Sequence, residues 1–217
     1  MIPQISFILS CLFLNYSYSK LDAKLFNISR KYGLLNEEKQ AYVIKNVLKS
    51  ASLSLIVVFS SYFILPDIIY GTWNNTVLGT FASLYVSNDI VGLYNVKLHT
   101  STRLHHMTAA IFLLGAWSVD FQTSTTAKML CIYTLFSSIT FPVNLYLGLR
   151  YVFNTEEKEM QVLKNISKWT YSICCILNWV VQLYMGVMNS ELYMLVYSLG
   201  LIFIIYDDII LLKWFFK

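Results

Sequence analysis

The sequence predicts an all-α fold, a polytopic bundle of membrane helices. Hydrophobic residues make up 57% of the 217 residues and charged residues only 13%, whereas a soluble domain carries roughly 25% charged residues. The mean hydropathy is +0.56. The apolar residues form long continuous segments, and only helices or closed barrels satisfy the backbone inside a bilayer. Because these segments are too long for barrel strands, we expect helices.

Seven apolar segments are the expected helices. In chain order they are Pro3–Tyr18, Val43–Leu65 (closed by Pro66), Val77–Val96, Leu104–Val119, Ala127–Tyr151, Trp169–Met188 and Leu192–Phe216. A spanning helix needs about 20 apolar residues. The first and fourth segments are shorter than this. We expect the fourth either to extend into its polar flanks or to lie deep in the bundle.

The first segment precedes the longest connection of the chain. It lacks a basic start and a small-residue cleavage site, so we interpret it as a retained anchor helix and not as a signal peptide. The amphipathic stretch Leu21–Tyr32 is expected to lie along the membrane interface. Asn36, followed by two acids, has the pattern of a helix start. We therefore predict an anchor helix and interfacial segment over residues 1–36 and a six-helix membrane domain over residues 37–217.

The basic residues predict the orientation of the bundle. In the seven-helix arrangement, every Lys and Arg except Lys128 flanks the same side of the membrane. The positive-inside rule then places the N-terminus in the lumen or outside and the C-terminus in the cytosol. The net charge of +4 is spread over membrane-flanking loops without a compact basic patch, so we expect no nucleic-acid partner. No feature predicts the oligomeric state.

The cysteines and the absence of cofactor motifs limit the possible chemistry. The thiols lie within apolar segments, at Cys11, Cys131, Cys174 and Cys175, and we interpret them as packing residues. Neither a disulfide framework nor a zinc-ligand spacing is visible. We expect no cofactor and no bound metal.

Two adjacent histidines, His105 and His106, stand at the start of the fourth segment. Ionisable groups in a membrane usually mark a pathway or a site, and histidine titrates near neutral pH. Neighbouring residues on a helix diverge by about 100°, so we do not expect both rings to point squarely into one cavity. One alternative is an interfacial anchor beside Arg103. Another is a metal site with a third ligand from Asp89 or Asp207.

Further polar side chains lie at membrane depth. They are Asn88, Asp89, Asn144, Asn178, Gln182, Asp207 and Asp208. For the amides, hydrogen bonding between helices is the alternative to a role in binding. The acids are costlier to bury, so we expect Asp89 or Asp207 to lie within reach of a histidine. We expect at most one of the adjacent acids Asp207 and Asp208 to point inward.

The run Ser87-Asn88-Asp89-Ile90-Val91-Gly92 is followed by Thr102-Arg103-Leu104-His105-His106. This pattern resembles the aspartate, short turn and His-His pair of the TLC-domain family, whose members include the ceramide synthases. A second similarity is Ser138-Ile139-Thr140-Phe141-Pro142-Val143-Asn144-Leu145, followed by Leu149-Arg150-Tyr151. A third is the basic entry from Glu38 to Ser50. The acid that the family carries before its Ser-Thr-Pro stretch is absent.

The resemblance implies a TLC-only protein that senses, transports or balances membrane lipids, located in the endoplasmic reticulum. His105, His106 and Asp89 would then meet a lipid headgroup, with further contacts from Asn88, Asn144, Asn178, Asp207 and Asp208. The alternative is an acyltransferase that joins acyl-CoA to a long-chain amine. In that case a histidine of the pair removes a proton, Asp89 orients it, and Lys97 and Arg103 meet the CoA phosphates. The sequence leaves open whether the protein is an enzyme.

Overall fold

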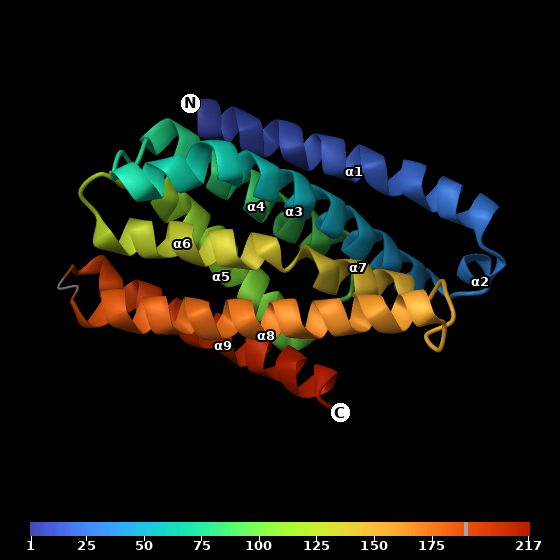
Figure 1. Cartoon of the computed structure of the whole chain (residues 1–217). Coiled ribbons are helices and arrows are strands. Elements are labelled where there is room, and N and C mark those ends of the chain that lie inside the picture. The colour runs from blue at the N-terminus through green and yellow to red at the C-terminus, as the bar shows by residue number, and fades with distance from the viewer. Residues whose placement is uncertain (189–190) are drawn as a thin grey trace.

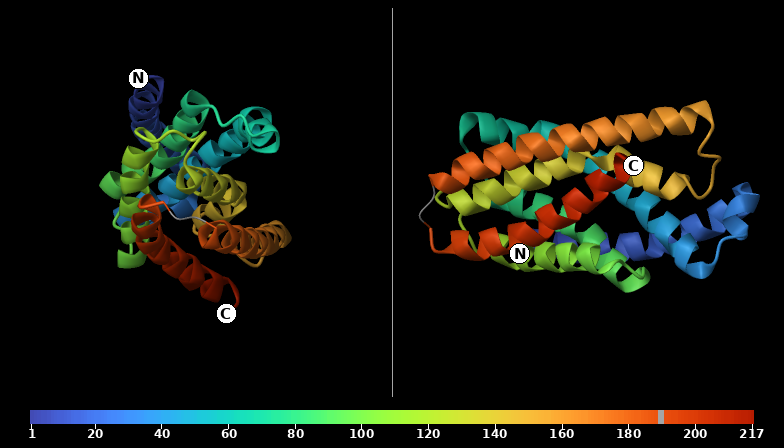
Figure 2. Two further views of the ribbon diagram at one scale, coloured as in Figure 1. Left: turned by 90° about the vertical axis from the view of Figure 1, so that its left-hand side faces the viewer. Right: turned by 90° about the horizontal axis from the view of Figure 1, so that it is seen from below.

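The computed structural model describes residues 1–188 and 191–217, which form helices and no strand (Figure 1). The helices are α1 (Ile2–Ile28), α2 (Arg30–Gly33), α3 (Glu37–Tyr70), α4 (Asn75–Asn95), α5 (Thr100–Ala116), α6 (Thr125–Ile139), α7 (Phe141–Leu149), α8 (Lys158–Val187) and α9 (Tyr193–Phe215). The long helices run roughly along one axis, and successive ones alternate in direction (Figures 1 and 2). The predicted all-α fold is confirmed for this part of the chain.

Three helices, α3, α8 and α9, are long and apolar enough to cross a membrane, and α6 with α7 makes a fourth if the bent pair is one span. These spans agree with a membrane protein. The fourth predicted segment became α5, which begins at Thr100 and thus extends into its polar flank, as expected. With 17 residues it is about 26 Å long, slightly less than the roughly 30 Å of a bilayer core.

The ends of α3 follow from local chemistry. The Asn36 side chain accepts a hydrogen bond from the backbone N–H of Lys39, which confirms the predicted helix start. The expected stop at Pro66 is wrong, because the helix continues through Pro66 to Tyr70. It ends at Gly71, whose φ of 69° lies in the left-handed region that glycine adopts without strain.

The N-terminal region differs from the prediction. A short anchor followed by a separate amphipathic stretch was expected, but α1 is one helix from Ile2 to Ile28. It packs along α4 and part of α3. Ser10 and Ser87 share a hydrogen bond of 2.7 Å between their hydroxyls, and Pro3 lies against Gly79. The amphipathic stretch did not separate because no glycine or proline lies between Pro3 and Ser29.

The fifth predicted segment is not one straight helix. It is broken at Thr140 into α6 and α7, which are bent by 42°. Pro142 lies in the first turn of α7, where its missing N–H costs nothing, whereas in a helix interior it would break the hydrogen-bond ladder. The backbone N–H of Thr140 closes the end of α6 by bonding to the carbonyls of Ser137 and Ser138.

The largest apolar core joins α3, α4, α5 and α6 and lies in the half of the bundle around Leu53, Phe81, Leu113 and Cys131. A smaller core joins α7, α8 and α9 around Tyr146 and Phe215. The bend between α6 and α7 lies between these cores. The polar cavity described next is lined from this bend and from the facing helices α3, α5 and α9.

Candidate functional site

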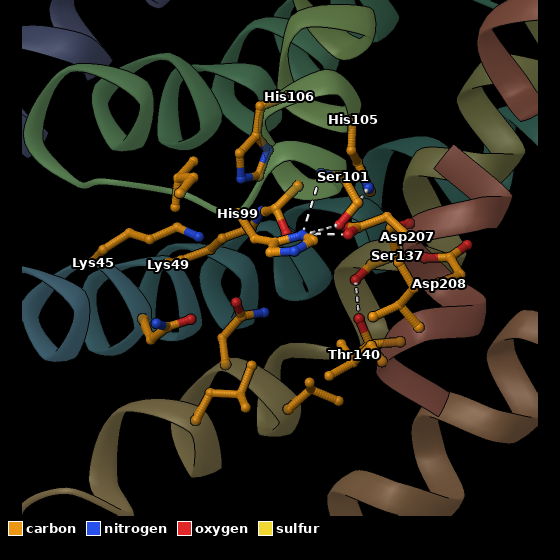
Figure 3. A pocket seen from close by; sticks show the side chains of 18 of the residues that line it. Lys45, Lys49, His99, Ser101, His105, His106, Ser137, Thr140, Asp207 and Asp208 are labelled. Atoms are coloured by element: carbon orange, nitrogen blue, oxygen red, sulfur yellow. Dashed lines mark hydrogen bonds and ion pairs between the residues drawn. The ribbon is translucent and has the colours of Figure 1, made fainter. Parts of the chain in front are cut away.

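A cavity of about 540 Å³ opens between α3, the α4–α5 connection, α5, α7 and α9. Its mouth lies where Lys97 and His99, both exposed, connect α4 to α5. Cationic side chains on the wall come from Lys45, Lys49, Lys97 and Arg150, and acidic ones from Asp207 and Asp208. Figure 3 shows Lys45 and Lys49 of α3 reaching toward the histidines of the opposite wall. Basic side chains thus outnumber acidic ones on the cavity wall.

The deepest part of the site is a buried ionic cluster. Asp89 of α4 is fully buried, and its Oδ1 accepts a hydrogen bond from Lys49 Nζ at 2.5 Å. His106 Nδ1 lies 2.9 Å from the same oxygen, at an angle outside that of a hydrogen bond. The expectation that an acid would lie within reach of the histidine pair is therefore confirmed. Asp89 itself stands behind the cavity wall, which Lys49 and His106 form.

A second acid–histidine pair lies nearer the cavity. His105 Nδ1 is 3.3 Å from Asp207 Oδ2, and Thr102 donates a hydrogen bond to the other carboxylate oxygen of Asp207 at 3.1 Å. Both histidines line the same cavity, which we did not expect for adjacent residues. The two rings reach it beside different helices: His105 lies next to Asp207 of α9, and His106 lies next to Asp89 of α4.

Both adjacent acids of α9 also line the cavity, so the expectation of one inward carboxylate is wrong. Asp208 accepts hydrogen bonds from the hydroxyls of Tyr133, at 2.5 Å, and Tyr171, at 2.8 Å. These tyrosines come from α6 and α8 and satisfy the carboxylate without a cation. Asp207 faces α5 instead, because neighbouring residues on a helix point in directions about 100° apart.

Besides Asp89, three predicted site residues lie outside this cavity. Arg103 is exposed and does not line the wall. Asn88 is buried and bonds to the Leu84 carbonyl of its own helix, at 3.4 Å. Asn178 accepts a hydrogen bond from Gln182, which also bonds to Met129 and Tyr197. Both asparagines thus bond within their own helices, and it is Gln182 that makes the hydrogen bonds between helices expected as the alternative for such amides. Asn144 and Lys97 do line the cavity, as predicted.

The structure adds wall residues that sequence reasoning did not select: Lys45, Lys49, Arg150 and His99. We had assigned the first three to membrane-flanking positions. Lys45 and Lys49 are four residues apart, so they share one face of α3, and this spacing was the available signal. His99 caps α5 by accepting a hydrogen bond from the backbone N–H of Ser101. Nothing in its sequence context marked it as part of the site.

One group of side chains has the composition of a metal site. Ligand atoms of Asp89, His105 and His106 lie within 4.8 Å of one another. However, the Lys49 ammonium already contacts Asp89 Oδ1, and its positive charge opposes a second cation there. The basic wall favours an anionic or neutral polar group.

Comparisons of this chain with protein-family models, with curated proteins and with solved structures found no match.

Proposed function

We propose that this chain is a TLC-like integral membrane protein that binds a membrane lipid, with the polar headgroup in the basic cavity. The observation that carries this proposal is the contrast between the cavity and its surroundings. Charged and hydrogen-bonding side chains line the cavity, whereas large apolar side chains such as Leu55, Val180 and Ile202 are exposed on the outer faces of α3, α8 and α9. A ligand suited to both environments has a polar head and apolar chains.

The size of the cavity supports a site for the headgroup with the acyl chains mostly outside it. Its volume of about 540 Å³ lies within the range of roughly 300–1,000 Å³ of small-ligand sites. Apolar side chains on the wall, Leu53, Leu147 and Leu211, suit the first methylene groups of an acyl chain. The remainder of the chains would lie along the apolar outer faces. We place the function in lipid sensing, transport or homeostasis in the endoplasmic reticulum, with the cavity toward the cytosol.

Native mass spectrometry of the purified protein tests this proposal. We expect a co-purified lipid on the wild-type chain and its loss in Asn144→Trp, which fills the cavity from its wall. Ile173→Trp, on the exposed face of α8, is the matched control and should retain the lipid. A folded Asn144→Trp variant that retains the lipid as well as the control does would overturn the proposal.

One observation favours a second function, acyl transfer. The Asp207 carboxylate holds Nδ1 of His105 at 3.3 Å, which leaves Nε2 of this cavity-lining ring to act as a base. In the reaction, the nitrogen of a long-chain amine forms a bond to the thioester carbonyl carbon of acyl-CoA. The bond from that carbon to sulfur breaks, and His105 takes the proton of the amine. Lys97 at the mouth would meet the CoA phosphates.

Labelled acyl-CoA and a long-chain amine separate the two functions. If the protein is an acyltransferase, we expect the wild type to form labelled amide. His105→Ala should form at least 100-fold less, since general base catalysis contributes about 10²–10⁴-fold. Lys158→Gln, at an exposed lysine, should turn over normally. Bound lipid without any turnover by the wild type would leave lipid binding as the function.

A further inference from the structure

The wall of the cavity carries two cations that form no ion pair with a carboxylate of the described residues. Lys45 is 6% exposed, and its amino group has no ion-pair or hydrogen-bond partner within residues 1–188 and 191–217. Its stem packs against Gly92 of α4, and the residue lines the cavity wall. A buried cation without a partner is costly, so it indicates an anionic ligand.

Arg150 is the second such cation. It follows α7 and stacks on Trp214, with its guanidinium carbon 4.5 Å from the ring centroid. Its Nη2 donates a hydrogen bond to the hydroxyl of Tyr151 at 3.3 Å, and its buried Nε has no hydrogen-bond partner among the described residues. The aromatic rings fix the plane of the guanidinium, and a fixed guanidinium presents paired donors suited to phosphate or carboxylate oxygens.

The acids around the cavity are engaged elsewhere. Asp89 pairs with Lys49, Asp207 with His105 and Thr102, and Asp208 with two tyrosines. At the mouth, Lys97 pairs with Glu38 at 3.3 Å. Lys45 and Lys49 also repel each other from one face of α3, which further favours an anion between the walls. Lys45 and Arg150 are therefore the wall cations that form no ion pair among the described residues.

We propose that the cavity selects a lipid with an anionic phosphate headgroup, whose phosphate oxygens are bound by Lys45 of α3 and Arg150 at the end of α7. This inference rests on the proposed lipid-binding function and adds the class of headgroup. A phosphate offers enough acceptor oxygens for both cations and for the amide of Asn144, which lines the same wall. A lipid is the source because the wall continues into the apolar side chains of Leu53, Leu147 and Leu211.

The test uses two lipids that share acyl chains and differ in net charge. Purified full-length protein is equilibrated with equal amounts of phosphatidylglycerol and phosphatidylcholine, and native mass spectrometry gives the ratio bound. We expect the wild type to prefer phosphatidylglycerol by about tenfold, the ratio that one charge-assisted hydrogen bond provides. Lys45→Gln and Arg150→Gln should each reduce this preference to about twofold or less.

Two variants control for charge and folding. Lys45→Arg retains the cation and should keep the preference, which a merely structural role of the lysine stem does not predict. Lys158→Gln removes an exposed lysine at the start of α8, outside the cavity. This variant should also keep the preference for phosphatidylglycerol. Circular dichroism and gel filtration select the variants that fold.

Each remaining outcome contradicts a specific statement. Equal binding of both lipids by the wild type would overturn the selection of a net anionic headgroup, because phosphatidylcholine also carries a phosphate, and would leave lipid binding intact. No lipid bound to a folded wild type would overturn the proposed function itself. If inorganic phosphate or acyl-CoA bound in a Lys45-dependent manner while neither lipid did, the phosphate site would stand but a lipid would not be its ligand, and the proposal as stated would fail.

Discussion

Asp89 is the residue on which the buried cluster depends. It is fully buried, accepts a hydrogen bond from Lys49 and lies beside His106. Its second oxygen, Oδ2, has no hydrogen-bond partner among the described residues. The carboxylate therefore compensates an ammonium that is itself almost completely buried. Loss of the acid leaves that ammonium without a counter-charge, which is more costly than loss of the pair as a whole.

Asp89→Asn should destabilise the protein strongly. The amide has the shape of the carboxylate but no charge, and breaking a buried ion pair on one side costs about 3–5 kcal/mol. We expect a marked fall in the thermal unfolding temperature in detergent. The double variant Asp89→Leu/Lys49→Met, which removes both charges, should be more stable than Asp89→Asn. Glu156→Gln, at an exposed acid, is the control and should change little. If Asp89→Asn were as stable as the double variant, Asp89 and Lys49 would not be energetically coupled.

At the scale of single residues, the sequence predicted which groups would meet but not where every charge would lie. The contacts of Asp89 with His106 and of Asp207 with His105 followed from the cost of burying isolated charges. Lys45 and Lys49 had been assigned to the membrane border because they lie at one end of an apolar segment. How deeply these lysines are buried depends on how α3 packs against α4. The composition of one segment does not predict that packing.

At the scale of helices, the bend between α6 and α7 is held by its neighbours. Ser50 of α3 donates a hydrogen bond to the carbonyl of Phe141 at 2.9 Å. Ser167 of α8 donates one to the carbonyl of Pro142 at 2.8 Å. Pro142 was visible in the sequence, but whether it kinks a helix or separates two is decided by such partners. The bend matters because Ser137, Thr140 and Asn144 around it line the cavity.

Ser50→Ala and Ser167→Ala should each destabilise the protein by about 1 kcal/mol, the typical net contribution of a hydrogen bond. The serines act on different carbonyls from different helices, so we expect their effects to add. Thermal or denaturant unfolding in detergent measures the loss. Ser61→Ala is the matched control, because the exposed Ser61 hydroxyl bonds only to Val57 of its own helix. If the control loses as much stability, the effect comes from helix propensity and not from the bend.

The N-terminus of α6 is capped from another part of the chain. The Glu191 carboxylate accepts hydrogen bonds from the Ser124 hydroxyl and from the backbone N–H groups of Thr125 and Thr126. Burial alone raises the pKa of Glu191, but these hydrogen bonds outweigh it and lower the pKa below its ordinary value of 4.5. The negative charge also interacts favourably with the helix dipole.

This contact should make stability depend on pH in the acidic range. Because the folded pKa is lowered, the contribution of Glu191 is complete above pH 4.5 and is lost as the pH falls through the folded pKa. We expect Glu191→Gln to unfold at a lower temperature than the wild type at pH 7. The difference should shrink at pH 3. A difference that is the same at both pH values would mean that the charge contributes nothing.

At the scale of the whole molecule, the basic residues and the cavity belong to one end of the bundle. The cavity mouth, the end of α7 and the C-terminal part of α9 lie together there, and the chain reaches that end at the finish of α1, α4 and α7 (Figure 1). The alternating helix directions match the alternation predicted from the basic residues. Length and hydropathy alone identify fewer spans, since α1 and α4 are not apolar enough and α5, with 17 residues, is too short to qualify. Their polar residues pack inward, as Asp89 and His106 do, so composition underestimates how well they suit a membrane.

Cysteine accessibility tests whether these less apolar helices cross the bilayer. In a background without Cys11, Cys131, Cys174 and Cys175, we introduce single cysteines at exposed positions of the two ends. Thr76→Cys and Thr123→Cys report on one end, and Lys97→Cys, Lys158→Cys and Lys213→Cys report on the other. With the bundle spanning as a unit, an impermeant maleimide added to sealed microsomes should label the second set and reach the first set only after permeabilisation. Lys97 is the decisive position, because it follows α4 directly. If Lys97→Cys were labelled together with Thr76→Cys, α4 would not cross the membrane, and the cavity between α3, α5 and α9 would not open toward the cytosol.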